Sequence, residues 1–256
     1  MQMACLDLEG VLIPEIWIAV AEATGIDGLR RTTRDEPDYD TLMRYRLDLL
    51  AAHGLTLSEI QRVIGTLDPM PGAAEMVTWL RERFQLIILS DTFYEFGMPF
   101  MAKLGYPTLL CHKLEIADDR IVGYRLRMPD QKRAAVRRFH ELNYRVIAAG
   151  DSYNDTNMLA EADAGILFRP PANVIAEFPQ FPVTTDYAGL RDEFERAARE
   201  VDGVDVIVHH LHREALRVVA HALHERGSHQ ALDVAGPVVD FRRRHELAAL
   251  FHAGDE

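Results

Sequence analysis

Short apolar runs alternate along the chain with amphipathic segments. The runs at 3–8, 86–89, 144–149 and 164–168 are predominantly apolar and too short for ordinary helices. Runs of this length are typical of strands that are buried on both faces. Strands that alternate with helical patterns predict an α/β fold, here a Rossmann-like, mostly parallel sheet flanked by helices.

Helical spacing dominates the stretch between the first two runs. Ser58 is expected to be an N-cap there, because a serine hydroxyl can accept a hydrogen bond from the first helical turn. Pro69 and Pro71 then interrupt the pattern. The helices predicted in this and later segments are 38–50, 58–64, 73–84, 96–104 and 130–142. Segments 108–116 and 121–126 flank a polar turn and predict a β-hairpin.

A pair of acids follows the first apolar run. Asp7 and Glu9 lie two residues apart just past the predicted strand. One carboxylate could attack phosphorus as a nucleophile, and the other could donate and then accept a proton. Gly10 would allow the sharp turn that this loop needs. Two solvated acids in a turn are the commoner meaning of such a pair, so this loop alone decides little.

The second and third apolar runs also end in polar loops. Ser90, Asp91 and Thr92 offer a hydroxyl and backbone N–H groups where a strand meets a helix, which can bind an anion, although a helix cap is the more frequent meaning. Asp151 could ligate Mg²⁺ through oxygen, and Asp155 would lie behind it. An aspartate helix cap is the alternative for that pair.

One cation completes the set. Lys132, at the start of a predicted helix, could screen a carboxylate nucleophile from a phosphate dianion, although most such lysines are simply solvated. In an open α/β sheet, ligands bind beyond the carboxyl ends of the strands, where these loops would meet. Together the residues predict Mg²⁺-dependent phosphoryl transfer through an aspartyl-phosphate on Asp7.

These motifs resemble those of the haloacid dehalogenase superfamily of phosphatases and phosphotransferases. Within it, residues 3–200 resemble the ThrH-type enzymes, notably in "ACLDLEGVLIPEIWIA" and "RVIAAGDSYNDTNML". The resemblance implies a phosphoserine phosphatase that also passes phosphate from phosphoserine to homoserine. It implies functional roles for the residues Asp7 (nucleophile), Asp7, the Glu9 carbonyl and Asp151 (Mg²⁺ ligands), Ser90 and Lys132 (phosphate clamps), and Asn154 and Asp155 (support around the metal).

The resemblance also implies how the substrate is held. Glu15 and Arg46 match positions that grip the ammonium and carboxylate groups of phosphoserine, and Tyr39 matches an aromatic that packs over the substrate. An arginine suits a carboxylate because its planar fork bonds both oxygens. Glu9 departs from most of the superfamily, which has Asp there, but the ThrH-type enzymes share it. We hypothesise that the longer side chain slows water attack and favours an alcohol acceptor.

Domain organisation follows from the same likeness. We expect a catalytic core at 1–14 and 70–200, a small helical cap at 15–69, and an appended helical segment at 203–256. Eight of the eleven histidines lie in that last segment, several at i, i+3 spacing. A metal site there would need further ligands, so histidines on the polar face of a capping or dimer-forming helix are favoured. The sequence leaves open whether the protein forms a homodimer.

Composition limits the remaining choices. The net charge of −12 argues against nucleic acid and against an anionic membrane surface as partners. Cys5 and Cys111 lie in apolar runs and are expected to be buried thiols in a reducing, cytoplasmic setting. The alternatives to phosphoserine turnover are a superfamily phosphatase for another small phosphomonoester and a non-catalytic phosphate-binding regulator. A receiver domain is disfavoured, since it lacks the long insertion after its first strand.

Overall fold

The structure is a computed structural model that describes residues 1–33, 35–36 and 38–201. The chain divides into two compact units, Met1–Val206 and Ile207–Glu256, and every described residue belongs to the first. The predicted segment 203–256, with its histidines, therefore lies outside the described residues. The description below concerns the first unit alone.

Seven strands of the described part form one sheet in the order β4-β3-β2-β1-β5-β6-β7. Neighbouring strands are parallel except for the β3–β4 hairpin, so the predicted mostly parallel sheet and the predicted hairpin are both confirmed. The strands are β1 (Gln2–Leu6), β2 (Gln85–Phe93), β3 (Thr108–Ala117), β4 (Arg120–Arg125), β5 (Arg145–Gly150), β6 (Ala164–Phe168) and β7 (Val183–Thr184).

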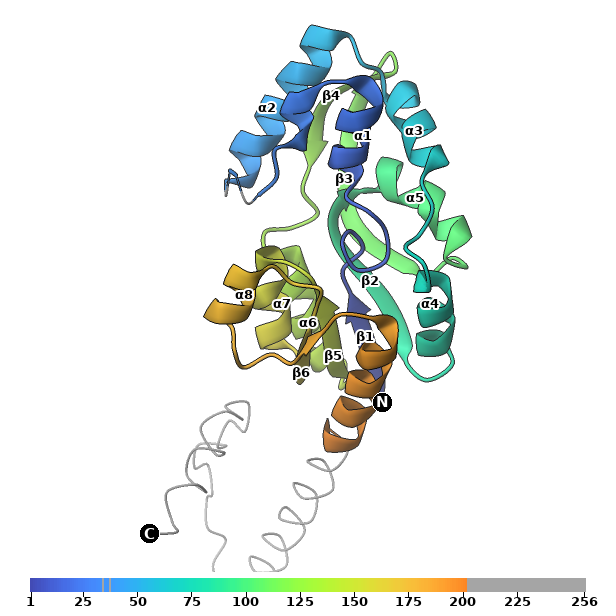
Figure 1. Cartoon of the computed structure of the whole chain (residues 1–256), viewed down its shortest axis with the longest axis vertical. Coiled ribbons are helices and arrows are strands. Elements are labelled where there is room, and N and C mark those ends of the chain that lie inside the picture. Colours follow the sequence, from blue (N-terminus) through green and yellow to red (C-terminus); the bar gives the residue numbers. More distant parts are fainter. Residues whose placement is uncertain (34, 37, 202–256) are drawn as a thin grey trace, which may run out of the picture. The chain divides into compact units, whose positions relative to one another are not determined.

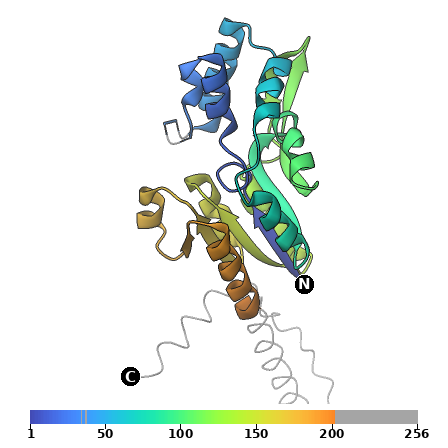
Figure 2. The same ribbon diagram turned by 45° about the vertical axis from the view of Figure 1, so that its right-hand side comes forward.

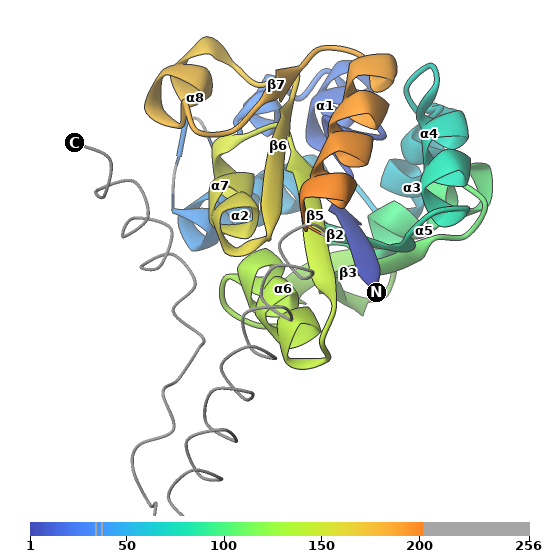
Figure 3. The same ribbon diagram turned by 90° about the horizontal axis from the view of Figure 1, so that it is seen from below.

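Helices cover both faces of the sheet. They are α1 (Ile16–Thr24), α2 (Tyr39–His53), α3 (Leu57–Thr66), α4 (Ala73–Arg81), α5 (Tyr94–Lys103), α6 (Gln131–Glu141), α7 (Thr156–Glu161) and α8 (Ala172–Glu177), with 3₁₀ turns η1 (Asp27–Arg30) and η2 (Tyr153–Asp155). Residues 187–201 form a further helix. Figure 3 shows α6 and α7 on one face, with α4 and helix 187–201 on the other.

Alternation along β1 explains why both faces are buried. Ala4 and Leu6 belong to one apolar cluster, whereas Met3 and Cys5 belong to the other, because successive strand side chains point to opposite faces. Burying both faces stabilises a central parallel strand, and it accounts for the continuous apolar run in the sequence. Cys5 and Cys111 are buried and unbridged, as predicted.

Helices α1, α2 and α3 lie together beyond the carboxyl ends of β1 and β2, and two views agree on this (Figures 1 and 2). The tip of the β3–β4 hairpin reaches the same group, since the Ser58 hydroxyl and N–H both bond the Asp119 carboxylate. The helices expected within 15–69 are therefore present. Their division from the core as a separate cap stays a prediction.

Two local predictions are wrong. Ser58 does not cap α3, because Thr56 is the N-cap and forms a reciprocal capping box with Glu59. Residues 90–92 are not a loop either, since β2 continues to Phe93 and pairs with β3 again after a register shift. The sequence did not predict strand β7, helix α8 or the helix at 187–201. No helix within the described ranges is long and apolar enough to cross a membrane.

Candidate active site

The loop after β1 is folded tightly against the loop after β5. Asp7 extends the β1–β5 pairing, since its N–H donates to the Ala149 carbonyl over 3.0 Å. Gly10 then has φ +77°, a conformation that L side chains rarely adopt. A Cβ at Gly10 would collide with the Asp151 carboxylate. Glycine is thus needed at position 10, because the side chain of Asp151, just after β5, packs directly on the backbone of the loop after β1.

Ser90, Asp91 and Thr92 lie at an irregularity near the end of β2. Three residues here face a single position of β3, between the pairs Leu89–Leu110 and Phe93–His112. A bulge of this kind re-aims side chains and frees backbone N–H groups next to active sites. The predicted anion-binding groups are present, but they arise from a bulged strand rather than from a helix cap. The N-cap of α5 is Phe93.

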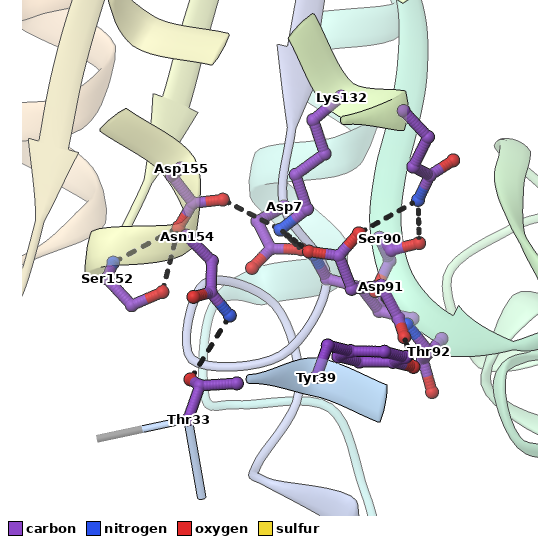
Figure 4. Close-up of polar contacts among 12 residues, drawn as sticks. Asp7, Thr33, Tyr39, Ser90, Asp91, Thr92, Lys132, Ser152, Asn154 and Asp155 are labelled. Atoms are coloured by element: carbon purple, nitrogen blue, oxygen red, sulfur yellow. Dashed lines mark hydrogen bonds and ion pairs between the residues drawn. The ribbon is translucent and has the colours of Figure 1, made fainter. Parts of the chain in front are cut away.

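Lys132 projects from the first turn of α6 into the space between the loops. Its ammonium lies 2.9 Å from Asp7 Oδ1, 2.8 Å from Asp155 Oδ1 and 3.5 Å from Asp91 Oδ2. Figure 4 shows the ammonium among these carboxylates, which come from three different strand ends. Burial alone would lower the pKa of Lys132, but the three carboxylates outweigh it and hold the pKa well above its ordinary value.

Asp155 is fully buried and its oxygens are already engaged. Oδ1 accepts from Lys132, while Oδ2 accepts from the N–H groups of Asp151 and Ser152 and from the Ser152 hydroxyl. Gly150 makes this possible, because a Cβ there would overlap the Asp155 side chain. The arrangement favours Asp155 as the residue that orients Asp151 and Lys132.

The carboxylates fit a divalent cation. Asp7, Asp151 and Asp155 each offer an oxygen within 4.8 Å of the others. Burial raises the pKa of Asp7 well above its usual range, and the neighbouring Asp155, Asp151 and Asp91 raise it further against the pull of Lys132. The cluster thus carries more negative charge than one lysine offsets. An all-oxygen donor set with excess negative charge suits a hard cation such as Mg²⁺.

Glu9 is held at the start of α1. Its Oε2 accepts a hydrogen bond of 2.9 Å from the Ile16 N–H, and its carboxyl also bonds the Thr92 side chain. Burial raises the pKa of Glu9 to about 7, helped by nearby Glu15 and opposed by Ile16, Thr92 and Arg46. A carboxyl with such a pKa can give and take a proton near neutral pH.

The residues expected to grip the substrate converge from the helical segment. Arg46 is buried, stacks over the Trp17 ring at 4.6 Å and donates to the Arg31 carbonyl over 2.8 Å. Its Nε has no hydrogen-bond partner among the described residues. Tyr39 donates to the Asp91 carbonyl over 3.0 Å. Glu15 precedes α1, next to Glu9.

A single pocket joins these groups. Its lining residues are Asp7, Glu9, Glu15, Trp17, Thr32, Thr33, Tyr39, Arg46, Ser90, Asp91, Thr92, Lys132, Asp151, Ser152 and Asn154. Every predicted site residue lines it except Asp155, which lies behind it. The lining residues that the sequence did not predict are Trp17, Thr32, Thr33 and Ser152; the first three lie outside any motif, whereas Ser152 follows Asp151 directly. Asn154 reaches one of them, donating to the Thr33 hydroxyl over 3.2 Å.

Fold and pocket together define a Rossmann-like phosphoryl-transfer site with an aspartate at the end of its central strand. The haloacid dehalogenase-like hydrolase family model matches residues 1–163. A Pseudomonas aeruginosa protein named phosphoserine phosphatase ThrH is 66% identical to this chain over 199 residues. The match covers 77% of this chain and 97% of that protein. The chain belongs to the haloacid dehalogenase-like hydrolase family.

Two further relatives agree with this placement. A phosphoserine phosphatase of Pseudomonas syringae pv. tomato is 64% identical over 199 residues, 77% of this chain and 84% of its own. The crystal structure of phosphoserine phosphatase from T. onnurineus matches with a TM-score of 0.59 and 26% identity, covering 75% of this chain and 92% of that one. The two Pseudomonas proteins thus share much of the sequence of this chain, and the T. onnurineus structure shares its architecture.

Proposed function

We propose that the protein is a phosphoserine phosphatase that carries phosphate on Asp7 and also transfers it to homoserine. The observation that carries the proposal is the position of Lys132, 2.9 Å from Asp7 and 2.8 Å from Asp155, in a pocket shared with Glu15 and Arg46. The proposed nucleophile, the lysine that would neutralise its charge, and the residues that would bind the amino-acid part of the substrate therefore line one pocket. The relatives named phosphoserine phosphatase support the choice of substrate.

The proposed first step phosphorylates Asp7. A carboxylate oxygen of Asp7 attacks phosphorus, and the bond from phosphorus to the serine oxygen breaks. Glu9 gives its proton to that departing oxygen, which its pKa of about 7 allows near neutral pH. Lys132 offsets the negative charge that gathers between Asp7 and the phosphoryl group.

The second step reverses the proton transfer. Glu9 takes a proton from water or from the hydroxyl of homoserine, and the oxygen so activated attacks phosphorus. The bond from phosphorus to Asp7 breaks, and inorganic phosphate or phosphohomoserine leaves. The Ser90 hydroxyl, which accepts from the Thr92 N–H over 3.3 Å, and the backbone N–H groups at the β2 bulge would hold the phosphoryl oxygens in both steps.

Binding of the amino-acid part is assigned to the helical side of the pocket. Arg46 has a buried Nε with no hydrogen-bond partner in the described part of the chain, and it would bond the substrate carboxylate, with Trp17 holding its plane by stacking. Glu15 would accept from the substrate ammonium, and Tyr39 would pack over the substrate. Serine and homoserine share these two charged groups, so one clamp serves the donor and the acceptor.

Mg²⁺ is the proposed cofactor. Asp7, Asp151 and the Glu9 carbonyl would hold it, and Asp155 would keep Asp151 and Lys132 in position. When bound, the ion would neutralise negative charge on the phosphoryl group and on Asp7. The excess of carboxylates around Lys132 supports this assignment.

One assay tests the proposal. With Mg²⁺, the protein should release phosphate from phosphoserine, and added homoserine should divert part of it into phosphohomoserine. Asp7→Asn should abolish both, whereas Asp68→Asn, which alters a surface ion pair with Lys103, should keep both. Turnover of other phosphomonoesters without phosphoserine would instead favour a superfamily phosphatase of different specificity. Phosphate binding without any turnover would favour the regulatory alternative.

A further inference from the structure

The ammonium of Lys132 is surrounded by three carboxylates that differ in how firmly they are fixed. An ammonium has three N–H donors, and the three oxygens around it belong to Asp7, Asp155 and Asp91. Lys132 thus forms ion pairs with three carboxylates, and a hydrogen bond with Asp155, before any phosphate arrives. A phosphoryl group on Asp7 would need a share of the same ammonium.

Asp91 is the carboxylate best placed to yield. Its distance to Lys132 is 3.5 Å, longer than the 2.9 Å and 2.8 Å of the other two. Its side chain is 30% exposed, whereas those of Asp7 and Asp155 are 8% and 0% exposed. Asp155 is also fixed by two backbone N–H groups, and Asp7 is the reacting group. Displacing Asp91 therefore costs least.

Other groups hold Asp91 in this position. Gln131 donates to Asp91 Oδ1 over 3.3 Å, and Nε2 of buried His112 lies 3.6 Å from the same oxygen. His112 Nδ1 accepts from the Arg127 N–H over 3.1 Å. A neutral His112 therefore carries its proton on Nε2, facing Asp91. The carboxylate is thus aimed at the pocket by donors on its far oxygen, while Oδ2 faces Lys132.

We propose that Asp91 competes with phosphate for Lys132, so that it occupies the third donor of the resting ammonium and weakens the hold on free inorganic phosphate. A phosphoryl group bonded to Asp7 is placed covalently and displaces the carboxylate. Free phosphate has no such anchor and must overcome the like charge. The product would then leave readily, and the pocket would be free for the next substrate. This inference rests on the proposed phosphoryl transfer at Asp7.

Phosphate binding tests the proposal without using turnover. Affinity for inorganic phosphate is measured by calorimetry in the presence of Mg²⁺. Asp91→Asn and Asp91→Ser should bind phosphate about tenfold more tightly than the wild type, because one like charge at short range is removed. Asp91→Glu keeps the charge and should bind phosphate as weakly as the wild type. Asp68→Asn removes an equal charge at a surface pair and should change nothing.

The outcomes are separable. Unchanged or weaker phosphate binding in both Asp91→Asn and Asp91→Ser would overturn the proposal, as would equal tightening in Asp91→Glu. Thermal unfolding identifies which variants are folded, and the smaller Ser replacement carries the test if Asn destabilises the bulge. Tighter phosphate binding together with no phosphoserine turnover would support the role of Asp91 while refuting the substrate assignment.

Discussion

The carboxyl of Glu9 accepts a hydrogen bond from the backbone N–H of Ile16, 2.9 Å away, at the first residue of α1. The N-cap residue Glu15 makes no capping hydrogen bond with its side chain among the described residues, and Glu9 supplies such a bond from the loop after β1. The proposed acid/base group is therefore tied to the helical segment that also carries Glu15 and, further along, Arg46. An aspartate at position 9, shorter by one methylene, would not reach both the Ile16 N–H and the pocket.

Shortening Glu9 should change how phosphate is divided between water and homoserine. In Glu9→Asp the carboxylate loses the Ile16 bond and is free to activate water, so hydrolysis should rise relative to transfer. The ratio of inorganic phosphate to phosphohomoserine, measured across homoserine concentrations, checks this. Thr92→Val removes the other hydrogen bond to Glu9 but leaves the Glu9 side chain at its full length. It is therefore a matched control. An unchanged ratio in Glu9→Asp would contradict the hypothesis that the length of Glu9 favours transfer to homoserine.

The pH profile should carry the signature of Glu9. The pKa of this carboxyl is raised to about 7, so the protonated form is lost as the pH rises through that value. Phosphorylation of Asp7 uses the protonated form, and kcat/KM for phosphoserine reports this step. We expect kcat/KM to fall above about pH 7 in the wild type. Glu9→Gln should be slow and lack this fall; a persistent fall would assign it to another group.

Replacing Arg46 by lysine should raise KM for phosphoserine by about tenfold or more with little change in kcat, because a lysine cannot form a two-pronged bond to a carboxylate. O-Phosphoethanolamine lacks the carboxylate and serves as the matched substrate. Its KM should be the same for the wild type and for Arg46→Lys. Equal losses with both substrates would mean that Arg46 supports the pocket rather than the substrate carboxylate.

Gly10 and Gly25 offer a paired test of the contact between the two catalytic loops. Both have positive φ, +77° and +72°, so an alanine at either should cost about 1 kcal/mol of unfolding free energy. A Cβ at Gly25 would meet no atom of the described residues within 4 Å, whereas one at Gly10 would collide with Asp151. Gly10→Ala should therefore be less stable than Gly25→Ala and bind Mg²⁺ more weakly. Thermal unfolding measures the stability and calorimetry measures the Mg²⁺ affinity. Equal losses in Gly10→Ala and Gly25→Ala would argue against the contact between the loops.

Much of this site could be predicted because its parts follow apolar strands. Parallel strands bring their carboxyl ends to one edge, so Asp7, Asp151 and the β2 segment were expected to converge. The bulge at 90–92 was not, since it depends on how β2 pairs with β3 far along the chain. The role of His112 depends on the same pairing, whereas that of Gln131 depends on how α6 packs against β2.

Other misses had a local signal. Thr56 and Glu59 have the spacing of a capping box, which favours Thr56 over Ser58 as the start of α3. Tyr187, Leu190 and Phe194 repeat at helical spacing, and they are buried in the helix at 187–201. By contrast, β7 has only two residues, too few for any pattern to indicate.

The central position of β1 also bears on how the enzyme is made. β1 pairs with β2 on one side and with β5 on the other, and β5 is among the later strands to be synthesised. A nascent chain leaving the ribosome therefore presents the Asp7 carboxylate long before its lysine and its β5 neighbours exist. The pocket that joins Asp7, Lys132 and Asp151 can form only after β5 has been translated, so its assembly depends on contacts between distant parts of the sequence.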